Sequence, residues 1–142
     1  LGAAGDSLVL VGRYMLDTIG FDMVRLDAVK HIEPGFLAPF LVELRNGAQP
    51  FTVGESFEGN AGLLKDYQQQ VESFNTTFGT GSKNANMAIF DFALRFALQG
   101  MVDNTNYNMS NLNSAGLRFM PGGGLAAADI VTFVENHDFD RG

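Results

Sequence analysis

The sequence predicts an α/β fold in which parallel strands alternate with helices, and three observations support this prediction. Short apolar, β-branched runs alternate along the chain with segments whose apolar residues recur every three or four positions. Three of these runs lead into a carboxylate, namely Asp27, Glu55 and Asp138. Because the carboxyl ends of parallel strands meet at one edge of a sheet, we expect these three carboxylates to lie together.

The first part of the chain is predicted to form a helix, a strand and a second helix. Residues 8–19 have apolar positions at mixed three- and four-residue spacing, which predicts an amphipathic helix that Gly20 ends. Residues 21–26 are predicted to form a buried strand. A Pro-Gly pair then interrupts the chain before a helix over about residues 36–46.

The same alternation continues through the second part of the chain. Two polar and poorly periodic segments, residues 56–85 and 103–124, are predicted to be long loops, the latter with a helical turn near Leu112. The other predicted elements are a strand at 51–54, a short helix at about 63–70, a strand at 87–92, a helix at 92–102 and a strand at 128–134. This order is typical of parallel βαβ units.

Composition and charge exclude several classes of partner. The chain has 142 residues, with 9 basic and 16 acidic residues, a net charge of −7 and a pI near 4.6. A phosphate backbone would be repelled, so we expect no nucleic acid partner, whereas a neutral, hydroxyl-rich substrate is compatible. Without cysteine the chain forms no disulfide or thiolate metal site. No apolar stretch reaches membrane-spanning length, so we expect no membrane partner.

Three strings in the sequence resemble the second, third and fourth signature regions of the α-amylase family of glycoside hydrolases. They are Gly20-Phe21 leading to Arg25-Leu26-Asp27-Ala28-Val29-Lys30-His31, then Gly54-Glu55, then Phe133-Val134-Glu135-Asn136-His137-Asp138. Their order and spacing also agree, and thin similarity through the connecting segments extends the resemblance over essentially the whole chain. The resemblance implies part of a (β/α)8 TIM barrel, about strands 4 to 7 with their helices.

The resemblance also implies a domain organisation. A complete barrel of this kind needs about 250 residues. The chain has no initiator Met, and the first signature region of the family is absent. We therefore expect residues 1–142 to be a single catalytic domain that is incomplete at both ends and inactive alone. The full-length enzyme is expected to be secreted and monomeric.

The resemblance implies a role for each carboxylate. Asp27 is the nucleophile, Glu55 the general acid/base, and Asp138 the third carboxylate, which binds ring hydroxyls in the transition state. Two of these roles also follow from the residues themselves. Arg25 points to the same side of its strand as Asp27 and favours the ionised carboxylate that a nucleophile needs. Apolar neighbours should raise the pKa of Glu55 and keep it protonated for acid catalysis.

The resemblance further implies substrate and metal contacts. Lys30 and His31 contact glucose units on the leaving-group side, His137 binds hydroxyls of the cleaved sugar, and Arg25 belongs to the same binding set. The resemblance implies that Phe57 lines the acceptor side of the site. An equal alternative is that Phe57 is a loop aromatic that only packs on the barrel. The backbone carbonyl of His31 corresponds to a calcium ligand whose partners lie upstream, so calcium is the expected cofactor.

The sequence therefore predicts a retaining glycoside hydrolase that cleaves internal α-1,4-glucosidic bonds of starch-like glucans by double displacement. The string Val29–His31 favours an α-amylase over α-1,6-specific relatives. The alternative is an α-glucan transglycosylase of the same family, because Phe57 and the string 103–106 resemble cyclodextrin glycosyltransferases. A minor alternative is a non-catalytic carbohydrate-binding homologue, which should have lost a carboxylate, and all three are present.

Overall fold

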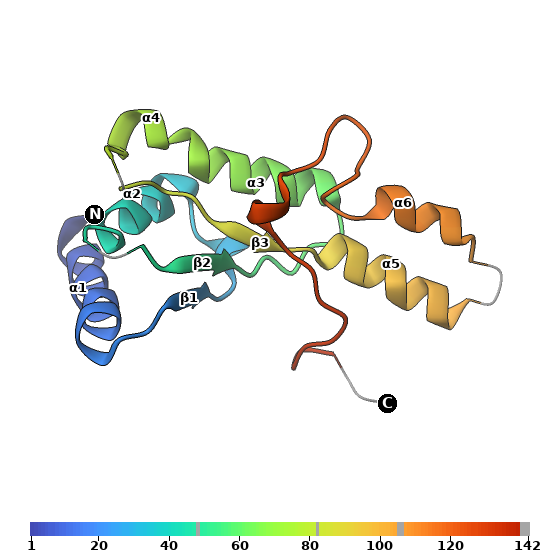
Figure 1. Cartoon of the computed structure of the whole chain (residues 1–142), viewed down its shortest axis with the longest axis horizontal. Helices are drawn as coiled ribbons and strands as arrows, with labels where there is room; N and C mark the ends of the chain where they lie inside the picture. Colours follow the sequence, from blue (N-terminus) through green and yellow to red (C-terminus); the bar gives the residue numbers. More distant parts are fainter. Residues whose placement is uncertain (48, 82, 105–106, 140–142) are drawn as a thin grey trace.

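The computed structural model describes residues 1–47, 49–81, 83–104 and 107–139, and it contains a sheet of four parallel strands (Figure 1). The strands are β1 (Met23–Leu26), β2 (Phe51–Gly54), β3 (Ala88–Phe90) and β4 (Ile130–Val131). Their spatial order is β1-β2-β3-β4, so that consecutive strands are neighbours. Parallel neighbours need a crossover, and helices lie in each crossover. The arrangement confirms the α/β class and is consistent with part of a (β/α)8 barrel.

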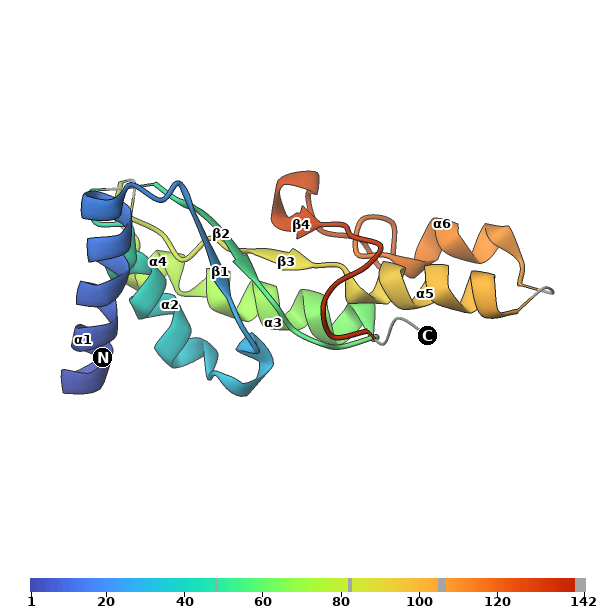
Figure 2. The same cartoon turned by 90° about the horizontal axis from the view of Figure 1, so that it is seen from below.

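Helices precede the sheet and fill its crossovers. The α-helices of the described residues are α1 (Gly2–Arg13), α2 (Pro34–Leu44), α3 (Ala61–Ser73), α4 (Asn75–Phe78), α5 (Phe92–Asp103) and α6 (Leu112–Ala115). A π-helical turn, Tyr14–Ile19, extends α1. In Figure 2, α2 and α3 lie on one side of the strands. None of the helices in these described ranges is long and apolar enough to cross a membrane.

The order of the predicted elements is confirmed, whereas several of their bounds differ. The first helix begins earlier than expected but stops where predicted, at Gly20, whose φ of 87° is the left-handed conformation that glycine favours. The helix α3 is longer than the predicted helix because the side chain of Asn60 caps its start, accepting hydrogen bonds from the backbone N–H groups of Gly62 and Leu63. Thr105 and Asn106 of the string 103–106 lie outside the described residues.

The last strand is much shorter than the predicted strand at 128–134, and that prediction is wrong. The strand β4 pairs through Ile89 with Ile130 and through Phe90 with Val131. A final ladder bond runs from the backbone N–H of Asp91 to the carbonyl of Val131, at 2.9 Å. The helix α5 begins directly after Asp91, so β3 offers no further partner. The segment from residue 132 to Asp138 therefore leaves the sheet.

The core consists of two hydrophobic clusters on the helix side of the sheet. The first joins α2 and α3 to the ends of the strands and contains Val29, Leu37, Ala38, Leu41, Val42, Val71, Ala85 and Met87. The second joins α3, β3 and α5 and contains Leu64, Ile89, Phe92, Ala93, Leu117 and Leu125. Tyr67 packs against both clusters, and its hydroxyl donates a hydrogen bond of 2.8 Å to the carbonyl of Ile32. Burial raises the pKa of Tyr67 to about 12, so its hydroxyl stays protonated.

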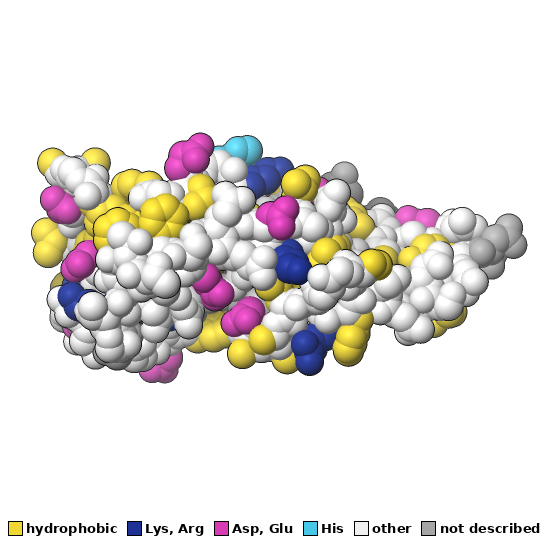
Figure 3. Space-filling model, turned by 90° about the horizontal axis from the view of Figure 1, so that it is seen from above, with side chains coloured by type: hydrophobic (Ala, Val, Ile, Leu, Met, Phe, Trp, Pro, Cys, Tyr) yellow, Lys and Arg dark blue, Asp and Glu magenta, His cyan; other side chains and the backbone are white. Residues whose placement is uncertain are grey.

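The opposite face of the sheet is open to solvent in this chain. Met23 and Phe51, which are paired in register between β1 and β2, are 62% and 43% exposed. Further large apolar side chains on and after α1 are exposed as well. Figure 3 shows hydrophobic side chains gathered toward the end of the molecule that α1 forms. Strands of a parallel sheet are normally covered on both faces, so the described residues supply only one of the two layers.

Asp91 joins β3, α5 and the loop that follows α6. One carboxylate oxygen accepts from the backbone N–H of Leu94 at 3.0 Å, which caps α5, and the other accepts from that of Leu117 at 2.9 Å. The side chain is 1% exposed, and burial raises its pKa while these two hydrogen bonds oppose the shift. A Cβ atom at Gly116 would lie 2.7 Å from the carboxylate, so the loop approaches it through glycine. Asp91 therefore holds three elements together.

We predict that Asp91→Ala lowers the free energy of unfolding by about 2 kcal/mol, because α5 loses its cap and the buried N–H of Leu117 loses its acceptor. Urea unfolding of the wild-type and variant proteins measures the difference. Asp66→Ala, at an exposed position in α3, is the matched control and should change stability by less than about 0.5 kcal/mol. Equal stability of the two variants would contradict the role of Asp91.

Candidate active site

Backbone hydrogen bonds between the ends of β1 and β2 place the first two carboxylates. The N–H of Glu55 donates to the carbonyl of Leu26, and the N–H of Val29 donates to the carbonyl of Glu55, both at 2.8 Å. Between these bonds the chain turns through Ala28, whose φ of 50° and ψ of 37° are left-handed. This conformation is costly for a residue with a Cβ, and it persists because the surrounding bonds hold it. Asp27 and Glu55 consequently leave the same edge of the sheet.

Arg25 connects these two carboxylates. One terminal guanidinium nitrogen lies 2.6 Å from Oε2 of Glu55 and 3.3 Å from Oδ1 of Asp27. The side chain of Glu55 is 8% exposed and that of Asp27 is 78% exposed. The sequence suggested that Arg25 serves Asp27, but the shorter contact is with Glu55. The site therefore pairs one buried and one solvent-facing carboxylate around a single cation.

Burial raises the pKa of Glu55 and is the largest influence on it. Hydrogen bonding to Asp27 raises this pKa further, while Arg25 opposes the shift through its hydrogen bond and its charge. The direction is the one that the apolar neighbours of Glu55 predict. A raised pKa means that Glu55 keeps its proton to higher pH than an ordinary glutamate, so it can donate a proton while Asp27 remains in contact with solvent.

Asn136 brings the third carboxylate to the same place. Its amide nitrogen lies 3.4 Å from Oε1 of Glu55 and 3.5 Å from Oδ2 of Asp138. Its amide oxygen accepts a hydrogen bond of 3.1 Å from the backbone N–H of Asp138. His137 Nε2 lies 3.4 Å from Oδ1 of Asp138. Asn136 stands in the string 133–138 without a predicted role, and the feature that could have pointed to it is an amide two residues before Asp138.

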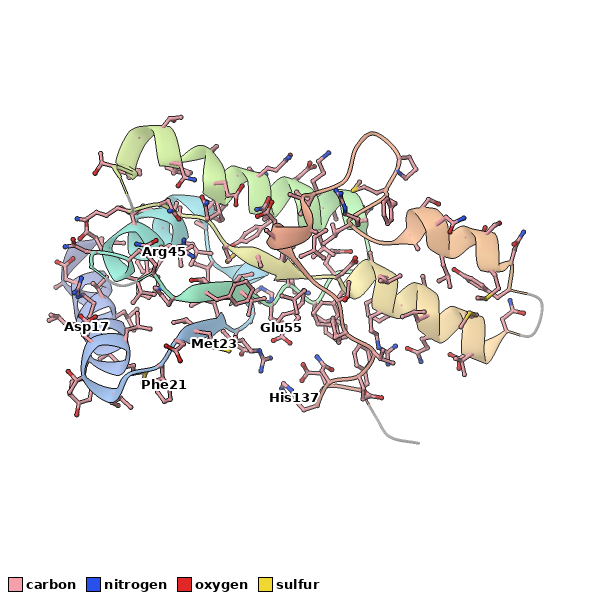
Figure 4. All side chains as sticks on the ribbon, viewed as in Figure 1. Asp17, Phe21, Met23, Arg45, Glu55 and His137 are labelled. Atoms are coloured by element: carbon pink, nitrogen blue, oxygen red, sulfur yellow. The ribbon has the colours of Figure 1, made fainter. Side chains whose placement is uncertain are left out.

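These groups surround an open pocket of about 140 Å³. The lining residues are Arg25, Glu55, Phe90, Phe133, Glu135, Asn136 and His137. Phe90 and Phe133 meet edge to face at 5.5 Å and form an apolar wall, which the sequence analysis did not single out. Figure 4 shows Glu55 at the end of β2 and His137 on the segment that passes it. The pocket thus combines an apolar wall with carboxyl, amide and imidazole groups.

The remaining residues of the predicted binding set lie beside this pocket. Lys30 Nζ donates a hydrogen bond of 2.8 Å to the carbonyl of Phe57 and lies 6.0 Å from the centroid of its ring. The centroid of the Phe57 ring lies 5.0 Å from that of Phe92, and Phe57 is still 40% exposed. The side chain of His31 is exposed on the turn after β1. The structure therefore brings Lys30 and Phe57 together, and His31 lies next to Lys30 with its side chain exposed.

The described residues do not by themselves fit a calcium ion. Calcium takes six to eight oxygen ligands. No group of three or more acidic, histidine or cysteine side chains within the described ranges could hold a metal ion. The calcium site that the resemblance predicts at the carbonyl of His31 is therefore not completed by the residues that the structure describes.

Comparison with proteins of known function finds enzymes that act on α-glucans. A glucan 1,4-alpha-maltohexaosidase of Bacillus sp. (strain 707) is 30% identical over 131 residues, which cover 89% of this chain and 22% of the relative. A cyclomaltodextrin glucanotransferase of Bacillus sp. (strain 6.6.3) is 30% identical over 141 residues, covering 92% of this chain and 17% of the relative. A second cyclomaltodextrin glucanotransferase, from Niallia circulans, is 35% identical over 130 residues, which cover 87% of this chain and 16% of the relative.

The chain thus spans about a fifth of the length of these relatives. No family model matches the sequence. The similarity extends over about nine-tenths of this chain, and the three carboxylates lie near one another at one edge of a parallel sheet. The chain is therefore a distant homologue of the α-amylase-family enzymes.

Proposed function

We propose that the protein containing this chain is a retaining glycoside hydrolase that cleaves internal α-1,4-glucosidic bonds of starch-like glucans. The observation that carries the proposal is the pair of unlike carboxylates around Arg25. Glu55 is buried and has a raised pKa, whereas Asp27 is mostly exposed. Glycosidic cleavage needs this combination of a carboxylic acid that holds a proton and a carboxylate that is ionised.

The reaction proceeds in two displacements. In the first, an oxygen of Asp27 forms a bond to the anomeric carbon as the bond to the leaving oxygen breaks, and Glu55 transfers its proton to that oxygen. In the second, Glu55 takes a proton from water, and the resulting hydroxide replaces Asp27 at the same carbon. The two inversions give net retention. Asp138 accepts hydrogen bonds from ring hydroxyls, which strengthen as positive charge develops on the sugar.

Arg25 and Asn136 support this chemistry electrostatically. Three carboxyl groups at one site repel one another when all are ionised. Arg25 supplies a positive charge between Asp27 and Glu55, and the amide nitrogen of Asn136 lies between Glu55 and Asp138. Protonation of Glu55 in the resting state removes one of the three negative charges. After the first displacement Glu55 is ionised, and both neighbours then stabilise its charge.

A transglycosylase of the same family is the second candidate, and Phe57 favours it. Its partly exposed ring is held in place by Lys30 and by packing on α5, so it can serve as an apolar platform for a sugar acceptor. Such a platform favours a sugar over water in the second displacement. Two of the three relatives named above are cyclomaltodextrin glucanotransferases.

Other properties of the whole protein rest on the family resemblance. We propose that the full-length enzyme is secreted and monomeric, and that it comprises the remaining strands of a barrel in which β1 to β4 are strands 4 to 7. We also propose a structural calcium ion that uses the carbonyl of His31 and ligands from outside this chain. The 142-residue chain expressed alone should be inactive, because the first and last strands lack partners on their outer edges among the described residues.

Glu55→Gln in the full-length enzyme is predicted to lower kcat on amylose by about 100-fold or more, because an amide has no proton to donate. On α-maltosyl fluoride, whose leaving group needs no proton, the first displacement should lose much less. Release of reducing ends measures the rate on amylose, and the initial burst of fluoride, which reports the first displacement alone, measures the rate on the fluoride. Glu58→Gln is the matched control, since its half-buried side chain accepts a hydrogen bond from the backbone N–H of Asn60 and lies outside the pocket. Equal losses on both substrates would contradict the acid role.

Asp27→Asn is predicted to abolish turnover of both substrates, because the bond to the anomeric carbon can no longer form. The loss should exceed about 1,000-fold in kcat even for α-maltosyl fluoride. Asp22→Asn, just before the opposite end of β1, controls for a change of charge near this strand. Retained fluoride release in Asp27→Asn would assign the nucleophile to another residue.

Product analysis distinguishes hydrolysis from transfer. We predict that digestion of amylose yields linear oligosaccharides with new reducing ends in proportion to bonds cleaved, because water is the acceptor in the proposed reaction. Chromatography of the products together with a reducing-end assay provides the measurement. Cyclic products, or disproportionation of a short maltooligosaccharide without a net rise in reducing ends, would show that the enzyme is an α-glucan transglycosylase instead.

A further inference from the structure

We propose that Phe139 is a positioning residue that holds Asp138 in place by anchoring the chain directly after it to α5. The proposal rests on the function proposed above, in which Asp138 is the third carboxylate. Phe139 has no predicted role from the sequence. In this proposal it acts through Asp138 and does not contact the substrate.

The need for an anchor follows from the short last strand. The strand β4 ends at Val131, and the ladder to β3 closes with the hydrogen bond from Asp91 to Val131. Asp138 lies well beyond this point on a segment that is not part of the sheet. Asp27 and Glu55, in contrast, are held by the backbone bonds at the ends of β1 and β2. Another interaction must therefore restrain Asp138, whose side chain is 42% exposed.

The Phe139 ring supplies such an interaction. The guanidinium carbon of Arg95 lies 3.4 Å from the centroid of this ring, which is close cation–π stacking. The ring also packs on Phe57 at 5.5 Å and on Phe96 at 5.7 Å. Arg95 is 7% exposed and donates a further hydrogen bond to Gln99, so its guanidinium is itself held on α5. The position of Phe139 is therefore set by a helix that is anchored in the core.

Asp138 is consequently restrained from both sides. Upstream, the amide of Asn136 contacts both Glu55 and Asp138. Downstream, Phe139 is fixed between Arg95 and the aromatic rings. The contacts of the Asn136 amide nitrogen are 3.4 and 3.5 Å long, at the upper limit for hydrogen bonds. The 3.1 Å bond from the Asp138 N–H to the Asn136 amide oxygen joins two residues of the same segment, so the upstream contacts tie Asp138 to the sheet only weakly. A displacement of about 1 Å in a group that acts in the transition state can cost about 100-fold in rate.

Phe139→Ala in the full-length enzyme tests the proposal. We expect kcat on amylose to fall by at least about tenfold while KM changes by less than about threefold, because a misplaced Asp138 loses contacts made mainly in the transition state. Phe139→Tyr keeps the ring and should restore kcat to within about threefold of wild type. Rates are measured well below the melting temperature of each variant, so that a loss of stability alone leaves kcat unchanged. Wild-type kcat in Phe139→Ala would overturn the proposal.

A matched control uses a second phenylalanine that faces an arginine. Phe119 is 70% exposed, and the guanidinium carbon of Arg118 lies 5.5 Å from its ring centroid. It belongs to the loop after α6 and not to the segment that carries Asp138. Phe119→Ala should therefore leave kcat within about twofold of wild type. An equal loss in both variants would show a general effect of removing a phenylalanine ring beside an arginine and would overturn the proposal.

A double-mutant cycle with Asp138→Asn separates positioning from other roles. If Phe139 acts through Asp138, adding Phe139→Ala to Asp138→Asn should cost less than about twofold in kcat. Additive losses would show that Phe139 acts independently, for example through Phe57, and would overturn the inference. Full activity of Asp138→Asn alone would overturn the proposed function, and this inference with it, so the two failures are distinguishable.

Discussion

The pair of backbone hydrogen bonds between the ends of β1 and β2 is the constraint on which the rest of the site depends. Through them Glu55 is bonded to Leu26 on one side and to Val29 on the other, while Ala28 accepts a left-handed conformation so that the turn can close. The cost of one strained residue is offset by two satisfied backbone groups and by the burial of Val29, which is fully buried in the first core cluster. Because these bonds join main-chain atoms, they set the separation of Asp27 and Glu55 whatever the surrounding side chains do.

The charges of the site are balanced within this frame. Arg25 contacts both carboxylates, more closely the one that is buried, and Asn136 adds an uncharged donor on the other side of Glu55. A buried ion pair keeps a carboxylate ionised, whereas desolvation and the hydrogen bond to Asp27 keep it protonated. For Glu55, desolvation and the hydrogen bond to Asp27 together outweigh the effect of Arg25, so its pKa rises. The burial of Glu55 thus favours the protonated carboxylic acid that glycosidic cleavage requires of a proton donor.

The third carboxylate is held by a different kind of structure. Regular strand pairing stops before it, and packing of aromatic rings on α5 takes over. Phe57 and Phe139 belong to the same aromatic group, so the loops that follow β2 and β4 share one support. The same helix is capped by Asp91, whose carboxylate also accepts a hydrogen bond from the loop after α6. The catalytic edge and the core are therefore connected through the start of α5.

Local patterns in the sequence determined the class of fold, the order of the elements and the three carboxylates. The strand at 51–54, the helix beginning at Phe92 and the stop at Gly20 rest on short-range rules of periodicity and backbone conformation, which need no knowledge of distant residues. The early end of β4, the preference of Arg25 for Glu55 and the contacts of Asn136 and Phe139 could not be predicted in this way. Each depends on which segments meet in space, because the length of β4 is set by where β3 ends and the partner of Arg25 is set by strand register and burial. Only the tertiary structure decides these features.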